Sequence, residues 1–142
     1  ATPNYIRRYG APTSPEDLLT HRLLAYRGKT GLQRWLFQRG EHDYAFSPQA
    51  KILSDNAELL LQAARNDAGM LLFPDWQVGE LLNRGELVAL LPEYTASYSP
   101  GEQSLWMLYP GGKYPSLNTR TVIDFLLASF GSPPYWRYTA TP

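Results

Sequence analysis

Two histidines, His21 and His42, are the only imidazole side chains in this chain of 142 residues, which contains no cysteine. They do not form an i, i+4 ligand pair, and without thiolates no zinc site of the usual ligand sets is predicted. The sequence also lacks Gly-x-Ser-x-Gly, Gly-x-x-x-x-Gly-Lys-Ser/Thr and Gly-x-Gly-x-x-Gly. We therefore predict no metal, no cofactor and no catalytic triad. His21 is interpreted as a cap or turn residue and His42 as a solvated side chain.

The charge pattern argues against a nucleic-acid surface on this chain. Lys and Arg together number 13, and Asp and Glu together number 13, so the net charge is zero. Arg34 and Arg39 flank Trp35 and Phe37, a combination that could stack on bases. Trp35 and Phe37 are two residues apart, however, so we expect them to share the inward face of a strand. No apolar run approaches the length of about 20 residues that spans a membrane.

The elements expected from the sequence alternate between strands and helices. An irregular entry leads to a short helix that begins at Ser14-Pro15 with Asp17 three residues after the cap. The helix at 57–66 is expected to be capped by Asp55, with Glu58 completing a capping box. The other expected elements are strands at 23–26, 70–73, 87–91 and 104–109, a hairpin of 33–39 with 44–46, a helix capped by Asp75 and ending at Gly85, a loop at 93–103, a helix at 119–130 capped by Ser116 or Asn118, and an extended or mobile tail at 132–142. This order predicts a small parallel or mixed sheet with helices on its faces.

Several of these segments, in this order, match a known pattern. The match begins with Pro3-Asn4-Tyr5-Ile6 and continues to His21, and later includes Trp35-x-Phe37. The remaining matching segments are 54–59, 72–76, 85–94, 109–110, 121–126 and 133–136. Together they resemble the second subdomain and closing elements of the effector-binding region of LysR-type transcriptional regulators. Each motif alone is weak, but their order and spacing cover nearly the whole chain.

The chain departs from this family pattern in two places. Members usually carry Gly-x-Gly before the buried strand, whereas Asp67 and Gly69 stand at those positions here. Because aspartate tolerates the left-handed conformation, we expect the helix to end there nevertheless. The resemblance also implies an N-terminal winged helix-turn-helix, a linker helix and the first strand and helix units of the effector region, none of which is in this sequence.

The resemblance implies an α/β fold like that of type II periplasmic binding proteins, in which a ligand cleft separates two lobes. Residues 1–94 would form effector-binding subdomain II, residues 95–103 a crossover, residues 104–131 the C-terminal strand and helix of subdomain I, and residues 132–142 a tail. In this arrangement the first lobe lacks its other strands. Leu105, Met107, Val122 and Leu126 are therefore expected to expose apolar surface or to find a cover in another chain.

The resemblance further implies that a small metabolite closes the two lobes of a cytoplasmic dimer or tetramer and so alters promoter binding by the helix-turn-helix. By position, the expected ligand-binding residues are Ser54, Asp55, Asn56, Phe73 and Pro74. A helix N-terminus offers N–H groups to a polar ligand, although Asp55 can equally serve as a cap and would repel an anion. The alternatives are a solute-binding component of a transporter, which shares the two-lobe fold, and an enzyme, for which no catalytic constellation is found.

Overall fold

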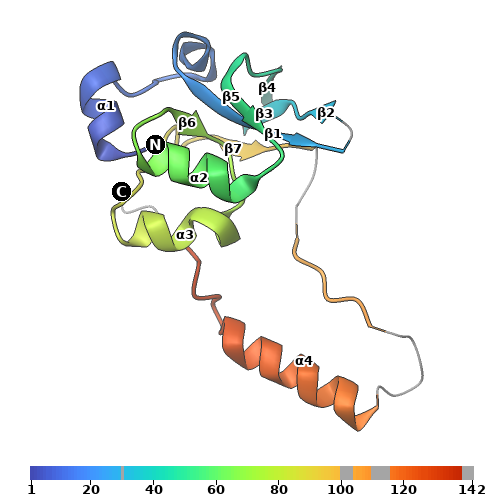
Figure 1. The fold of residues 1–142 in the computed structure, drawn as a ribbon. Helices are drawn as coiled ribbons and strands as arrows, with labels where there is room; N and C mark the ends of the chain where they lie inside the picture. The colour runs from blue at the N-terminus through green and yellow to red at the C-terminus, as the bar shows by residue number, and fades with distance from the viewer. Residues whose placement is uncertain (30, 100–103, 110–115, 139–142) are drawn as a thin grey trace.

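A computed structural model describes residues 1–29, 31–99, 104–109 and 116–138 (Figure 1). Its elements, in chain order, are α1 (Pro3–Tyr9), the 3-10 helix η1 (Pro15–Thr20), β1 (Leu23–Gly28), β2 (Gly31–Leu32), β3 (Trp35–Arg39), β4 (His42–Phe46), β5 (Ala50–Ser54), α2 (Ala57–Arg65), β6 (Met70–Leu71), α3 (Asp75–Asn83), β7 (Thr95–Ser97) and α4 (Leu117–Phe130).

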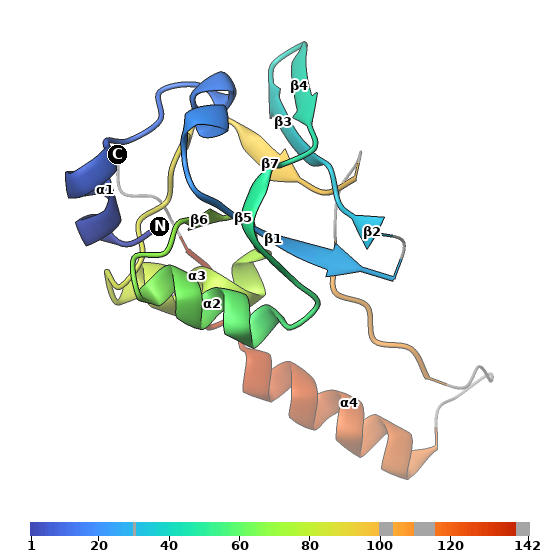
Figure 2. The same ribbon diagram turned by 45° about the horizontal axis from the view of Figure 1, so that its top comes forward.

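Strand β1 is the centre of the main sheet. It pairs in parallel with β5 on one side, and with parallel β6 and antiparallel β2 on the other. Leu23 and Leu24 point to opposite faces, as neighbouring residues of a strand must. Leu23 joins a core cluster with Trp35 and Phe37, whereas Leu24 packs against Leu60 of α2 in a second cluster. The predicted mixed sheet covered by helices is confirmed (Figure 2).

The hairpin of β3 and β4 forms as predicted, with Trp35 opposite Phe46 and Phe37 opposite Tyr44. Trp35 and Phe37 are both buried, which confirms their shared inward face. The prediction of a loop through 93–103 is wrong at Thr95–Ser97, because these residues form β7 along the other edge of β3.

Other expectations were wrong for reasons of backbone pairing. Strand β5 was not predicted. Its exposed Lys51 and Leu53 alternate with half-buried residues because β5 pairs with β1, a partner that its own sequence does not reveal. Residues 87–91 form no strand: Leu87 and Leu91 are buried, but the positive φ of Leu91 (55°) turns the chain. Only Val88 pairs its backbone like a strand residue, and its partner is Ala1.

The expected irregular entry is also wrong, because Pro3–Tyr9 is helix α1. The Thr2 hydroxyl accepts from the Tyr5 N–H at 3.1 Å, and Pro3 occupies the first turn. The predicted start of the next helix is confirmed: the Asp17 carboxylate accepts from the N–H groups of Thr13 and Ser14 at 2.8 and 3.1 Å. These bonds lower the pKa of Asp17.

The Tyr5 hydroxyl joins α1 to the beginning of β1. It accepts from the Arg22 N–H at 3.0 Å and lies 3.3 Å from Nδ1 of His21, the C-cap residue of η1. The change Tyr5→Phe is expected to lower the free energy of unfolding by about 0.5–1.5 kcal/mol, because it removes hydrogen bonds to the half-buried His21 and the exposed Arg22. Urea unfolding measures this loss. Tyr9→Phe is the matched control, since Tyr9 is 45% exposed, and an equal loss in both variants would contradict the role of the Tyr5 hydroxyl.

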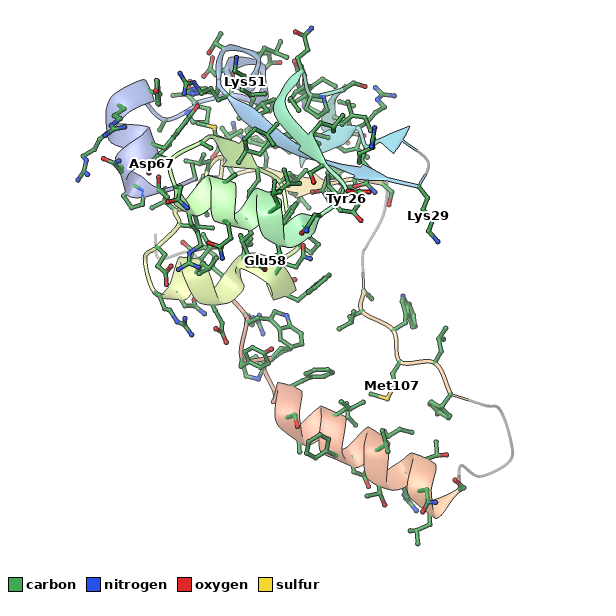
Figure 3. All side chains as sticks on the ribbon, viewed as in Figure 1. Tyr26, Lys29, Lys51, Glu58, Asp67 and Met107 are labelled. Carbon is green, nitrogen blue, oxygen red and sulfur yellow. The ribbon has the colours of Figure 1, made fainter. Side chains whose placement is uncertain are left out.

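Helix α2 ends at Arg65 with Asn66 as its C-cap, and Asp67 then turns the chain in the left-handed conformation, as the sequence predicted. Asp67 has a φ of 61°, and the N–H groups of Asp67 and Ala68 bond to the carbonyls of Ala64 and Ala63 at 3.1 and 3.0 Å. The Asp67 carboxylate accepts hydrogen bonds from the side chains of Thr2 and Asn4. Figure 3 shows Asp67 at this end of α2, beside α1. Asp67 thus turns the chain after α2 and accepts hydrogen bonds from the beginning of α1.

These bonds to Thr2 and Asn4, with Arg8 and Arg7 nearby, lower the pKa of Asp67. Its carboxylate therefore stabilises the fold above the ordinary pKa of 3.8, and this stabilisation is lost as pH falls through the lower pKa of the folded state. We expect Asp67→Asn to be less stable than the parent at about pH 7 and to approach it at about pH 2. Urea unfolding at both pH values tests this, and a constant difference would contradict it.

The C-terminal part stands apart from both core clusters (Figure 1). Residues 104–109 are extended but unpaired among the described residues, so the predicted buried strand is wrong. Ser116 caps α4 by accepting from the Thr119 N–H, which confirms one of the two predicted caps. No residue of α4 is buried. Leu105 and Val122 are 62% and 56% exposed, as expected. Met107 and Leu126 are half-buried, because residues 104–109 and α4 face each other across a groove that both side chains line.

The described part of the tail, up to residue 138, is not simply extended, because 131–136 form turns. Trp136 stacks edge-on against Phe130, with 5.2 Å between ring centroids. The carbonyl oxygen of Trp136 packs so tightly on α3 that a Cβ at Gly79 would lie 1.7 Å from it. Asn83 of α3 donates to the Arg137 carbonyl at 3.2 Å. The tail therefore joins α4 to α3.

Candidate functional site

The parallel strands β1, β5 and β6 end at one edge of the sheet, which we call the carboxyl edge. Ser54 closes β5 opposite Tyr26 of β1, and Phe73-Pro74 follow β6 on the other side of β1. Helices α2 and α3 begin at this edge, on the right in Figure 1, and Figure 3 shows Tyr26 there. The topology thus brings the predicted residues 54–56 and 73–74 to a common edge, about two strand spacings, or ~10 Å, apart.

Asn56, not Asp55, caps α2. Its Oδ1 accepts from the Leu59 N–H at 3.0 Å, and the Ser54 hydroxyl accepts from the Asn56 N–H at 3.0 Å. The predicted capping box is therefore wrong, and Glu58 instead accepts from Gln62 at 2.8 Å. Asp55 is exposed, and no described residue hydrogen-bonds its carboxylate. Asparagine and aspartate cap equally well, so the backbone decides between these neighbours.

This difference between the two neighbours gives a direct prediction. Asn56→Ala is expected to lower the free energy of unfolding by about 1 kcal/mol, because the Leu59 N–H loses its acceptor. Asp55→Ala is expected to change it by less than about 0.5 kcal/mol, because that side chain is exposed and unbonded. Urea unfolding of both variants decides the matter. A larger loss for Asp55→Ala would restore Asp55 as the cap.

Helix α3 begins one residue earlier than predicted. Pro74 occupies the N-cap position, and Asp75 is the first helical residue, where its carboxylate accepts from the Trp76 N–H at 2.8 Å. Phe73 and Pro74 are half-buried, whereas Trp76 is 46% exposed. Sequence reasoning missed Trp76 and Tyr26 as members of this edge. Neither residue was assigned a role in binding from the sequence, and an exposed aromatic side chain at a helix start is visible only in the fold.

The carboxyl edge combines backbone N–H groups at two helix starts, the Ser54 hydroxyl and aromatic rings, a set that suits binding of a small polar molecule. Asp55, Glu58 and Asp75 make its rim acidic. His21 contacts Tyr5 and His42 begins β4, so neither is part of the edge. Within the described ranges no group of three His, Cys, Asp or Glu residues could hold a metal ion.

Comparison with known proteins identifies the fold. Residues 1–131 match the family described as the LysR substrate binding domain. The chain belongs to this LysR family. Its fold also resembles the regulatory domain of AphB from Vibrio vulnificus, with a TM-score of 0.70 at 22% sequence identity over 90% of this chain and 61% of that one. The type II periplasmic-binding-protein-like architecture predicted from the sequence is confirmed.

Relatives of this LysR-family chain are transcriptional regulators. An uncharacterised HTH-type regulator of Haemophilus influenzae is 33% identical over 66% of this chain, and the HTH-type transcriptional activator TtdR of Escherichia coli is 29% identical over 90% of it. The chain spans 33% and 40% of their lengths. These relatives are named as regulators, not as transporter components, so the solute-binding alternative is not supported. None of the described helices is long and apolar enough to cross a membrane.

Proposed function

We propose that this chain is the effector-sensing portion of a bacterial LysR-type transcription factor and that it performs no bond chemistry. The observation that carries the proposal is the carboxyl edge, where strands β1, β5 and β6 end and helices α2 and α3 begin, on a chain of this family. A small metabolite binds at this edge between two lobes, and closure of the lobes changes how the protein engages promoter DNA.

In this proposal Ser54, Asn56, Phe73 and Pro74 contact the effector. Ser54 and Phe73 flank the end of β1, and Asn56 and Pro74 begin the two helices whose N–H groups face the cleft. Asp55 is exposed beside them and, having no role as the cap, serves as a contact for a hydroxyl or ammonium group of the effector.

We further propose that residues 1–94 form subdomain II, together with β7 at the start of the crossover 95–103, and that residues 104–131 belong to subdomain I and are followed by the tail 132–142. Exposure of Leu105 and of the apolar residues Phe125 and Leu127 of α4 supports this division, because exposed apolar surface of this kind is normally covered by other elements or by another chain. Met107 lines a groove of about 420 Å³ against α4 (Figure 3), as a strand of an incomplete sheet would.

The other assignments follow from the family. The regulator is a cytoplasmic homo-oligomer, dimer or tetramer, and it contacts DNA only through a helix-turn-helix that is not in this sequence. The equal numbers of 13 basic and 13 acidic residues agree with a sensing part that leaves DNA to another domain. This chain alone is therefore expected to leave duplex DNA unshifted in a gel at low salt.

The carboxyl edge is tested by nuclear magnetic resonance of the ¹⁵N-labelled chain with a panel of carboxylates, amino acids and monosaccharides. A member of the panel is expected to shift the amides of 54–59 and 73–76 together, with a Kd weaker than about 1 mM because the other lobe is absent. Asn56→Ala should reduce these shifts more than Gln62→Ala, a change further along the same helix. Tight binding by this chain alone, or shifts confined to other segments, would contradict the proposal.

A further inference from the structure

A pocket of about 180 Å³, partly open to solvent, lies between β3 and the extended residues 87–91. Trp35 and Phe37 form one wall, Met70 and Val78 another, and Leu87 and Leu91 a third. All six side chains are buried. Well-packed interiors contain few voids larger than a water molecule, so a space of this size is a distinct feature of the core.

The chemistry of the wall selects the occupant. Every residue that lines the cavity is apolar. The Ala1 nitrogen beside this wall donates to the Val88 carbonyl. Water gains few hydrogen-bond partners at this apolar wall, so an apolar ring can displace it, as benzene fills an apolar cavity of about 150 Å³ in another protein.

We propose that this cavity is a binding site for a small uncharged aromatic molecule of about the size of indole. The rings of Trp35 and Phe37 offer edge-to-face and offset contacts, and the Met70 sulfur offers a contact to a ring edge. A carboxylate or an ammonium group would lose its hydration without gaining a partner, so charged analogues are rejected. The site shares Phe73 with the carboxyl edge but lies on the β3 side of that residue, and it stands even if that edge binds nothing.

The site also has a structural link to the lobe's outer face. Leu71, Leu72 and Phe73 line it, and these residues lead from β6 directly into α3. An occupant therefore packs behind the Phe73-Pro74 corner and holds it from the inside. Binding is expected to raise the melting temperature of the chain, because the ligand binds the folded state alone.

The test uses the intact chain with indole as the probe. Indole is expected to bind with a Kd of about 0.1–1 mM and to shift the methyl resonances of Met70 and Val78 in ¹³C spectra. Indole-3-acetate, which adds a carboxylate to the same ring, is expected to bind at least about tenfold more weakly. No methyl shifts with about 5 mM indole, or equal binding of the acid, would overturn the proposal.

Filling the cavity supplies the matched variants. Val78→Phe projects a ring into the space and is expected to weaken indole binding at least about tenfold while the chain stays folded. Leu82→Phe fills the same cavity from the next turn of α3, should Val78→Phe fail to fold. Leu59→Phe, on the exposed side of α2, is the control and should bind indole unchanged. Full binding by a folded cavity-filling variant would place indole elsewhere and refute the site.

Discussion

Gly69→Ala is expected to lower the free energy of unfolding by roughly 3 kcal/mol, because the added methyl group has no room beside β1. A Cβ at Gly69 would lie 2.3 Å from the carbonyl oxygen of Arg22, a backbone atom. That oxygen also accepts from the Met70 N–H at 2.8 Å. The segments around Arg22 and Gly69 therefore cannot move apart without losing the hydrogen bond at the start of β6. Urea unfolding monitored by circular dichroism measures the loss.

Gly28→Ala is the matched control for this prediction. Gly28 is the last residue of β1, at the opposite end of that strand from Arg22, and the nearest atoms to an added Cβ there are 3.8 Å away. Its replacement is expected to change the free energy of unfolding by less than about 0.5 kcal/mol. Similar losses for both variants would show that chain flexibility, and not the contact with Arg22, makes Gly69 necessary.

Self-association through the exposed apolar surface of 104–109 and α4 is the second large effect expected. Leu108 is 91% exposed, Trp106 79% and Phe125 67%, and none of the three belongs to the hydrophobic core. Exposed apolar surface of this extent is rare on isolated monomers. The chain is therefore expected to associate at about 100 µM in sedimentation velocity, and to bind a hydrophobic dye such as ANS.

The change Phe125→Glu is expected to weaken this association at least about tenfold, because burial of a phenylalanine contributes about 1.5–3 kcal/mol. Thr121→Glu adds the same charge at an exposed polar position of the same helix and should leave association unchanged. A parent chain that stays monomeric and binds no dye would contradict the expectation. Equal weakening by both variants would assign the effect to charge alone.

The sequence was informative wherever one residue type had one structural meaning. Asp67 could end α2 because it tolerates positive φ, and Trp35 with Phe37 had to share a face because strands alternate. Apolar runs were ambiguous. Residues 70–71 pair with β1 and 87–91 do not, although both runs fill the core, because strand formation depends on an available neighbour that hydropathy does not reveal.

The candidate site followed the same division. Parallel strands end at the same edge of a sheet. The placement of Ser54 and the Phe73-Pro74 corner at one edge could therefore be anticipated from the predicted parallel or mixed sheet. The distinction between Asp55 and Asn56 could not, since a shift of one residue in the backbone turn exchanges their roles. Trp76 was missed because its exposure is a property of the folded surface, and Tyr26 because its place opposite Ser54 depends on the pairing of β1 with β5.

The contact between Gly79 and Trp136 has a mechanical consequence. Nine residues of α3 make a rigid rod about 13 Å long, with the carboxyl edge at its first turn and the Trp136 carbonyl seated on its second. The Trp136 carbonyl lies directly against the backbone of α3 at Gly79, so a movement of α4 is transmitted to α3. A displacement of α4 by a covering element would therefore tilt α3 and move Pro74 and Trp76 at its start. The close contact that glycine permits at position 79 thus couples α4 to the candidate site.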